Sequence, residues 1–150
     1  MRALITNDDG IESPGLHRLA QVARDQNLEV VVAAPLTEAS GSSAAINARE
    51  DEGRIVVEER SLPGLRGVEA YGVAASPAFI ALIATRGAFG RPPDLVLSGI
   101  NRGANVGHAV LHSGTVGAAL TGTAYGCRAM AVSLNVALEP EQPAHWDTAA

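Results

Sequence analysis

The chain has 150 residues, of which 47% are hydrophobic and 18% charged, so it can bury the core of one folded domain and is not expected to be disordered. Its net charge is −5 and it has no basic cluster, which argues against a nucleic-acid duplex as a partner. All 11 basic residues are arginines, and this excludes chemistry that needs a Walker-A or Schiff-base lysine.

The apolar runs and capping signals predict alternating strands and helices. We expect strands at about 2–6, 28–34, 68–71, 94–97 and 130–134, with a further edge strand at 54–58. Helices are expected at about 14–25, 77–87 and 114–125, and loops at 35–47 and 98–113. This order predicts one α/β domain over residues 1–150, a doubly wound, mostly parallel, Rossmann-like sheet flanked by helices.

The last residues read as the opening of a helix, with Asp147 as its N-cap. One helical turn cannot bury a face, so we expect a C-terminally truncated piece of a longer protein.

Two features of the sequence bear on where the protein is located: its single cysteine and the lengths of its apolar runs. Cys127 has no partner for an internal disulfide and precedes a predicted strand, so we interpret it as a small buried hydrophobe. No apolar run approaches the roughly 18 residues of a membrane span. We therefore expect a cytoplasmic protein without a membrane partner.

Two adjacent carboxylates, Asp8 and Asp9, follow the first predicted strand. Like charges side by side repel unless a cation lies between them, and the carboxyl ends of parallel strands are where ligands bind. Segments 39–43 and 98–107 follow two other predicted strands and should meet the acids at the same edge of the sheet. Carboxylate, hydroxyl and amide oxygens together suit Mg²⁺, Mn²⁺ or Ca²⁺ rather than zinc.

The segment 112–115 lies at the entrance of the third predicted helix. Unpaired N–H groups at a helix N-terminus bind phosphate, and glycine permits a close approach. Ser113 and Thr115 add hydroxyl donors. His112 is either a general acid for the leaving oxygen or an ordinary packed or surface histidine. A metal beside an anion cradle indicates phosphate-ester chemistry.

Four blocks in this order, MRALITNDDGIESPGL, APLTEASGSSAAI, DLVLSGINRGANVG and LHSGTVGAAL, resemble the survival protein SurE family. The resemblance implies a divalent-metal-dependent phosphatase with one Mg²⁺ or Mn²⁺ per subunit. It implies nucleoside 5′- and 3′-monophosphates as substrates, and short polyphosphate as a further one. It also implies a C-terminal portion that builds homodimers or homotetramers.

Carried over by position, the resemblance implies a metal site of Asp8, Asp9, Ser40 and Asn101. It implies phosphate contacts from Asn105, Ser113, Gly114 and Thr115. Asp8, Asp9, Asn101 and Ser113 are thereby the implied catalytic residues. From the residues alone, Ser42 or Ser43 could replace Ser40. The base could be either acid or the cation's own water, and Asp8 could also accept the phosphoryl group transiently.

The chain departs from the family's pattern at three places. Residues 72–77 read GVAASP where the family usually has a Gly-Thr-Pro-Ala-Asp-Cys stretch, Asn47 replaces a threonine, and an acid is absent from 108–110. An alternative function is therefore a nucleotide-binding module of the same fold without turnover. A receiver-like signalling domain is disfavoured because the chain has no lysine and its middle strand ends in Ser98-Gly99.

Overall fold

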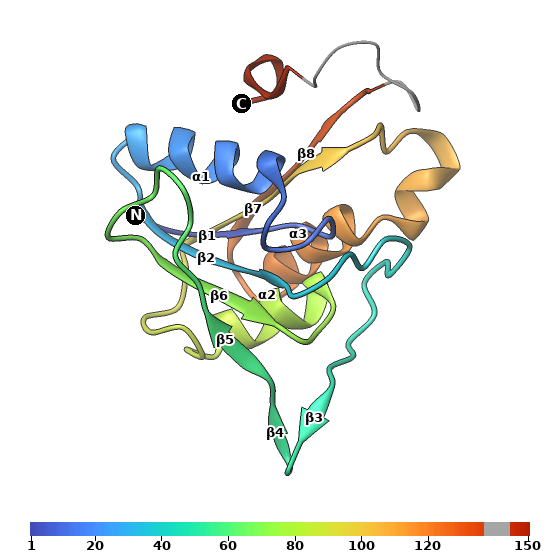
Figure 1. Cartoon of the computed structure of the whole chain (residues 1–150). Coiled ribbons are helices and arrows are strands. Elements are labelled where there is room, and N and C mark those ends of the chain that lie inside the picture. Colours follow the sequence, from blue (N-terminus) through green and yellow to red (C-terminus); the bar gives the residue numbers. More distant parts are fainter. Residues whose placement is uncertain (137–144) are drawn as a thin grey trace.

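A computed structural model describes residues 1–136 and 145–150 (Figure 1). The strands of the main sheet are β1 (Arg2–Thr6), β2 (Glu29–Pro35), β5 (Val57–Glu59), β6 (Glu69–Val73), β7 (Leu95–Arg102) and β8 (Arg128–Leu134). The α-helices are α1 (Pro14–Asp25), α2 (Pro77–Thr85) and α3 (Gly114–Ala124). A small hairpin, β3 (Glu50–Asp51) and β4 (Arg54–Ile55), and two 3₁₀ helices, η1 (Gly107–His112) and η2 (Trp146–Thr148), complete the described elements.

The main sheet has the strand order β5-β6-β2-β1-β7-β8. Its pairs are parallel except β5 with β6, which is antiparallel at one edge. The predicted doubly wound α/β fold is thereby confirmed. Because β1 lies at the centre between β2 and β7, the segments that follow these three strands emerge at the same edge of the sheet.

Helices cover both faces of the sheet (Figure 1). On one face Leu16 and Leu19 of α1 pack on Ile5, while on the other Ile80 of α2 and Ala118 of α3 pack with Leu4. Leu4 and Ile5 are successive residues of β1, so the alternation of a strand supplies both cores from one central element. No helix in the described ranges is long and apolar enough to cross a membrane.

Three expectations about element boundaries were wrong. Residues 98–102, expected in a loop, extend β7, because Asn101 and Arg102 pair with Ser133 and Leu134 of β8 beyond an irregularity in the register. The edge strand expected at 54–58 is divided between β4 and β5, and the hairpin β3–β4 projects from the body (Figure 1). Asp147 is no N-cap: it lies within η2, and its carboxylate pairs with Arg18 of α1 at 2.6 Å.

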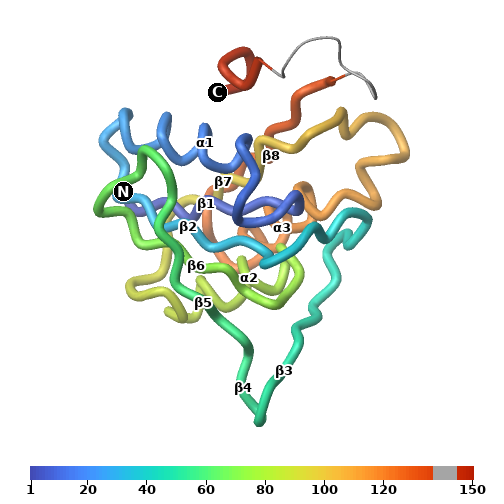
Figure 2. The backbone as a smooth tube through the Cα atoms, viewed as in Figure 1, coloured from blue at the N-terminus to red at the C-terminus, as the bar shows by residue number. Residues whose placement is uncertain are grey.

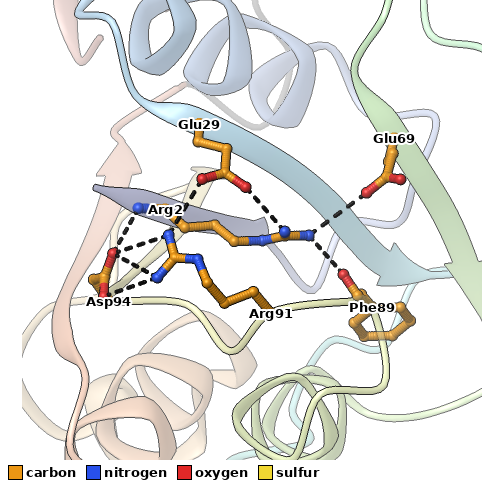
Figure 3. Close-up of polar contacts among 6 residues, drawn as sticks. All are labelled: Arg2, Glu29, Glu69, Phe89, Arg91 and Asp94. Carbon is orange, nitrogen blue, oxygen red and sulfur yellow. Dashed lines mark hydrogen bonds and ion pairs between the residues drawn. The ribbon is translucent and has the colours of Figure 1, made fainter.

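At the edge of the sheet opposite the predicted ligand site, hydrogen bonds and ion pairs connect the first residues of β1, β2 and β6 and the residue before β7 (Figure 3). Arg2, only 8% exposed, pairs with Glu29 at 3.0 Å and Glu69 at 3.5 Å, and it donates to the carbonyl of Phe89. Asp94 accepts the Arg2 backbone N–H at 2.7 Å. These bonds pair a buried guanidinium and fix the start of β1 between its neighbours.

Candidate active site

The carboxylate of Asp8 is held by the first turn of α3. Its Oδ1 accepts the Thr115 hydroxyl at 2.5 Å and its Oδ2 accepts the Thr115 backbone N–H at 3.1 Å. Asp8 is only 4% exposed, so both bonds act on a carboxylate almost withdrawn from water. The positive end of the helix dipole also favours a negative charge there.

Asp9 is held by a different element. Its Oδ2 accepts the backbone N–H of Arg102 at 2.9 Å, where β7 ends. Burial raises the pKa of the Asp9 carboxyl above its ordinary value of 3.8, and the negative charges of Asp8 and Glu38 raise it further, against the hydrogen bond from Arg102. The two adjacent acids thus have different surroundings: Asp8 is bonded through both oxygens, and Asp9 through one.

The loop 39–45, here called the serine loop, lies directly on the start of α3 (Figure 2). The Ser43 N–H donates to the carbonyl of His112 at 3.1 Å, just ahead of α3. A side chain at Gly117 would collide with the Ser43 carbonyl, and one at Gly114 would collide with the Ser42 hydroxyl. The glycines three apart on this helix are therefore what lets the loop approach Asp8.

The three serine hydroxyls of this loop have different surroundings. Ser40 donates to Glu38 at 2.6 Å and Ser43 to the carbonyl of Leu111 at 2.8 Å. The Ser42 Oγ is buried and has no hydrogen-bond partner among the described residues. Ser40, the predicted metal ligand, lines the same pocket as Asp9.

The two predicted asparagines lie on and after β7. The Asn101 amide donates to the carbonyl of Gly103 at 2.8 Å, which leaves its Oδ1 available as an oxygen ligand. The Asn105 amide donates to the Ser133 hydroxyl of β8 at 2.9 Å. Asn101 is thus next to Arg102, which bonds Asp9, while the Asn105 side chain is directed toward β8.

The predicted phosphate cradle is the N-terminus of α3. Ser113 is its N-cap, and its hydroxyl accepts the Val116 N–H at 3.2 Å. The Thr115 N–H is taken by Asp8, and the Gly117 N–H by the carbonyl of Ser113 at 2.9 Å. Gly114 is the first residue of α3, so its N–H has no acceptor within that helix and is a donor that a ligand could use. His112 is exposed at the end of η1.

Two pockets border these residues. The smaller, about 420 Å³, is lined by acids and by Ser40, Arg102 and Trp146. The larger, about 710 Å³, is lined by Ser42, Asn47, Arg49 and residues 73–76. Ser40 and Glu38 line both pockets, so the two spaces adjoin at these residues.

The donor set fits a hard divalent cation. Asp9 keeps one oxygen without a bond among the described residues, and Asn101 keeps its amide oxygen. Burial and the neighbouring charges of Asp8 and Glu38 raise the pKa of Asp9, and a cation beside it would act in the opposite direction. No group of three or more His, Cys, Asp or Glu side chains gathers as a metal site in the described ranges. A cation here would therefore use two carboxylates and neutral oxygens, as Mg²⁺ and Mn²⁺ do with retained waters.

Sequence reasoning missed the supporting role of Asn7. This fully buried residue donates to the carbonyl of Gly10 at 3.1 Å and to the Ser13 hydroxyl at 2.7 Å, and its Oδ1 accepts the Gly10 N–H. It thereby shapes the turn that presents Asp8 and Asp9. An asparagine directly ahead of two acids and a glycine was the available signal, because asparagine commonly bonds its own turn.

Comparison with known proteins agrees with this architecture. A family profile described as Survival protein SurE matches residues 3–150. The chain belongs to this family. It is 40% identical to the 5′-nucleotidase SurE of Dehalococcoides mccartyi, over 100% of this chain and 54% of that protein. It is 45% identical to the protein of the same name from Methanopyrus kandleri, over 91% of this chain and 49% of the relative.

The fold is similar to that of a solved family member. The crystal structure of the Sure protein from Aquifex aeolicus matches with a TM-score of 0.74 and 30% identity, covering 94% of this chain and 52% of that one. The present chain thus spans about half the length of the relatives it matches. The edge of the SurE-family sheet described above lies wholly within this half.

Proposed function

We propose that this SurE-family chain carries the catalytic centre of a divalent-cation-dependent phosphomonoesterase. Its substrates would be nucleoside 5′- and 3′-monophosphates, hydrolysed to nucleoside and phosphate, with short polyphosphate as a further substrate. The observation that carries the proposal is the buried Asp8 carboxylate, bonded through both oxygens to Thr115 at the N-terminus of α3. The 5′-nucleotidase names of relatives support the same reaction class.

A phosphate at this turn requires a cation. The site already contains two carboxylates, and a third anion beside them would be repelled without a positive charge between them. One Mg²⁺ or Mn²⁺, held by Asp8, Asp9, Ser40 and Asn101, would supply that charge and polarise the phosphoryl group. Ser113 and Gly114 would orient the phosphate oxygens. Thr115 gives its N–H and its hydroxyl to Asp8 and would act through that carboxylate, and Asn105 would turn from Ser133 to contact the phosphate.

Asp8 and Asp9 would have different roles in the reaction, because their hydrogen bonds differ. Both Asp8 oxygens accept hydrogen bonds from Thr115, which fixes the position of this carboxylate. Asp9 is bonded through Oδ2 alone, so its Oδ1 is available to the cation or to an attacking water, and either acid or the cation's own water could act as the base.

The nucleoside would occupy the pocket of about 710 Å³ that the serine loop helps to line. Its described lining contains no aromatic side chain, so recognition would rest on polar groups such as Asn47 and Arg49 rather than on stacking. We further propose a cytoplasmic enzyme that forms homodimers or homotetramers through its full-length chain.

The test is release of inorganic phosphate from a panel of 5′- and 3′-nucleotides and short polyphosphate. The natural protein is assayed with Mg²⁺, with Mn²⁺ and with EDTA. Asp8→Asn is the inactivating variant, and Asp25→Asn, at the far end of α1, is the matched control for the loss of one carboxylate.

Metal-dependent release that survives Asp25→Asn and disappears in Asp8→Asn is the expected result. Release that EDTA leaves unchanged would contradict the role of the cation. Nucleotide binding without any release would replace the enzyme by a binding module of the same fold.

A further inference from the structure

Glu38, the residue just ahead of the serine loop, has no role in the proposed reaction. It lines the pocket of about 420 Å³, which it shares with Asp9, and also the pocket of about 710 Å³. Among the described residues that line these pockets, only Ser40 does the same. Glu38 therefore lies where the space proposed for the cation adjoins the space proposed for the nucleoside.

The Glu38 carboxylate is restrained by one hydrogen bond and can accept more. Its Oε1 accepts the Ser40 hydroxyl at 2.6 Å. An ionised carboxylate offers about four lone-pair sites on its two oxygens, so this bond leaves most of the acceptor capacity for a ligand. The residue is exposed, so a ligand that enters from solvent can reach it.

Glu38 is also the only acidic residue in the described lining of the larger pocket. A carboxylate accepts hydrogen bonds and donates none, so it is complementary to a ligand that carries donors. The sugar of a ribonucleotide carries such donors in its neighbouring 2′- and 3′-hydroxyls. In dinucleotide-binding α/β domains, an acidic residue likewise accepts a hydrogen bond from a ribose hydroxyl.

We propose that the Glu38 carboxylate binds the ribose hydroxyls of the substrate, so that the enzyme favours ribonucleotides over 2′-deoxyribonucleotides. The inference rests on the proposed function, from which it takes the positions of the cation and the nucleoside. The favoured substrate class is the ribonucleoside 5′-monophosphate, because its 2′- and 3′-hydroxyls are both free. In a 3′-monophosphate the 3′ oxygen carries the phosphate, so only the 2′-hydroxyl of this pair remains.

The place of Glu38 favours the sugar over the base as its ligand. The phosphate would bind beside the cation, and the ribose is the part of a nucleotide that is joined directly to the phosphate. Asn47 and Arg49 line the larger pocket but not the smaller one, and the Arg49 N–H donates to the carbonyl of Ala74 at 2.7 Å, which holds this part of the wall in place. These two side chains are suited to the base, and Glu38, where the pockets adjoin, is suited to the sugar.

The test compares adenosine with 2′-deoxyadenosine, and their 5′-monophosphates with each other, in the natural full-length protein and two variants. Glu38→Ala removes the proposed contact. Glu12→Ala removes an acid that lines only the smaller pocket, and so controls for the loss of one negative charge near the cation. The Kd of each nucleoside, the kcat/KM of each monophosphate and the Kd of Mn²⁺ are measured. The ratio between the ribose and deoxyribose forms is decisive, because a change in folding or in cation affinity affects both forms alike.

We expect the wild type and Glu12→Ala to favour the ribose form about tenfold in both ratios, the effect of one hydrogen bond to a charged group. In Glu38→Ala both ratios should fall to about one, because the 2′-hydroxyl then has no carboxylate to bond. A ratio near one in the wild type would overturn the inference. A tenfold ratio that persists in Glu38→Ala would overturn it as well, since another group would then bind the hydroxyl.

The remaining outcomes separate this inference from the proposed function. Weaker Mn²⁺ binding in Glu38→Ala with an unchanged ratio would show that Glu38 acts on the cation through Ser40, and would overturn the inference. Equal turnover of both monophosphates by the wild type would refute the inference and uphold the phosphatase. A wild type that prefers adenosine through Glu38 but hydrolyses neither monophosphate would uphold the inference and refute the proposed function.

Discussion

At the scale of residues, adjacent acids acquire different properties from their hydrogen bonds. Asp8 accepts two bonds from Thr115, and Asp9 accepts one from the backbone of Arg102. Hydrogen bonds to the charged form stabilise a carboxylate, whereas burial without enough of them raises its pKa. Asp8 is thus fixed through both of its oxygens and Asp9 through one, although the two residues are identical and adjacent in the sequence.

Removing the Thr115 hydroxyl tests how much its hydrogen bond to the Asp8 carboxylate contributes to stability. Thr115→Val keeps the side-chain shape but removes the 2.5 Å bond to Asp8, and we expect it to lower the free energy of unfolding by about 1.5–3 kcal/mol. Thr121→Val is the control, because its hydroxyl donates to the neutral carbonyl of Gly117 in the same helix, at a cost of about 0.5–1.5 kcal/mol. Urea unfolding measures both, and a Thr115→Val loss no larger than that of Thr121→Val would contradict the charged anchor.

Asp94 predicts how stability depends on pH. The Arg2 backbone N–H and the Arg91 side chain lower the pKa of Asp94 below its ordinary value of 3.8. Its stabilising contribution is therefore complete above pH 3.8 and is lost as the pH falls through the lower, folded-state pKa.

The melting temperature of Asp94→Asn should consequently be lower than that of the wild type at neutral pH. The difference between the two melting temperatures should narrow below pH 3.8. Melting curves across this range measure the gap, and Asp51→Asn, on the exposed hairpin, controls for the loss of one carboxyl. A gap that stays constant through the acid range would show that the network does not depend on the Asp94 charge.

At the scale of elements, the small side chains of α3 serve close packing. The sequence of this helix, GTVGAALTGTA, carries glycines where the serine loop and the sheet approach it: Gly117 meets Ser43, and Gly122 meets Val96 of β7. Glycine within a helix ordinarily costs about 0.5–1 kcal/mol relative to alanine. Here that cost is offset by bringing the serine loop next to Asp8.

Gly117→Ala separates these two effects. Helix propensity alone would stabilise the protein by about 0.5–1 kcal/mol, whereas the collision with the Ser43 carbonyl should destabilise it by about 1–3 kcal/mol and weaken phosphate binding. Leu120→Ala, at a position 62% exposed on the same helix, should change stability by no more than about 0.5 kcal/mol. Chemical denaturation measures the sign, and a stabilised Gly117→Ala protein would refute the close contact.

At the scale of the whole molecule, sequence patterns predict the strands and helices better than they predict the contacts between segments that are distant in sequence. Buried strands and Ser-Pro helix starts were predictable because each depends on neighbours in sequence. The extension of β7 to Arg102 was not, since it depends on pairing with β8, and the choice among Ser40, Ser42 and Ser43 depends on how α3 packs against the loop. The roles of the predicted ligands remain a prediction.

The proposed metal site joins parts of the chain that only folding brings together. Asp9 follows β1, Ser40 follows β2 and Asn101 lies on β7, so unfolding would separate the ligands and a cation would bind the native state preferentially. Mn²⁺ at about 100 times its Kd should then add about 2.7 kcal/mol to the free energy of unfolding and raise the melting temperature by about 5–10 °C. EDTA should reverse the shift, Asp9→Asn should lose most of it, and Asp25→Asn, remote on α1, should keep it. An equal rise in Asp9→Asn would place the bound cation elsewhere on the protein, because a site built on this carboxylate cannot keep its affinity without the charge.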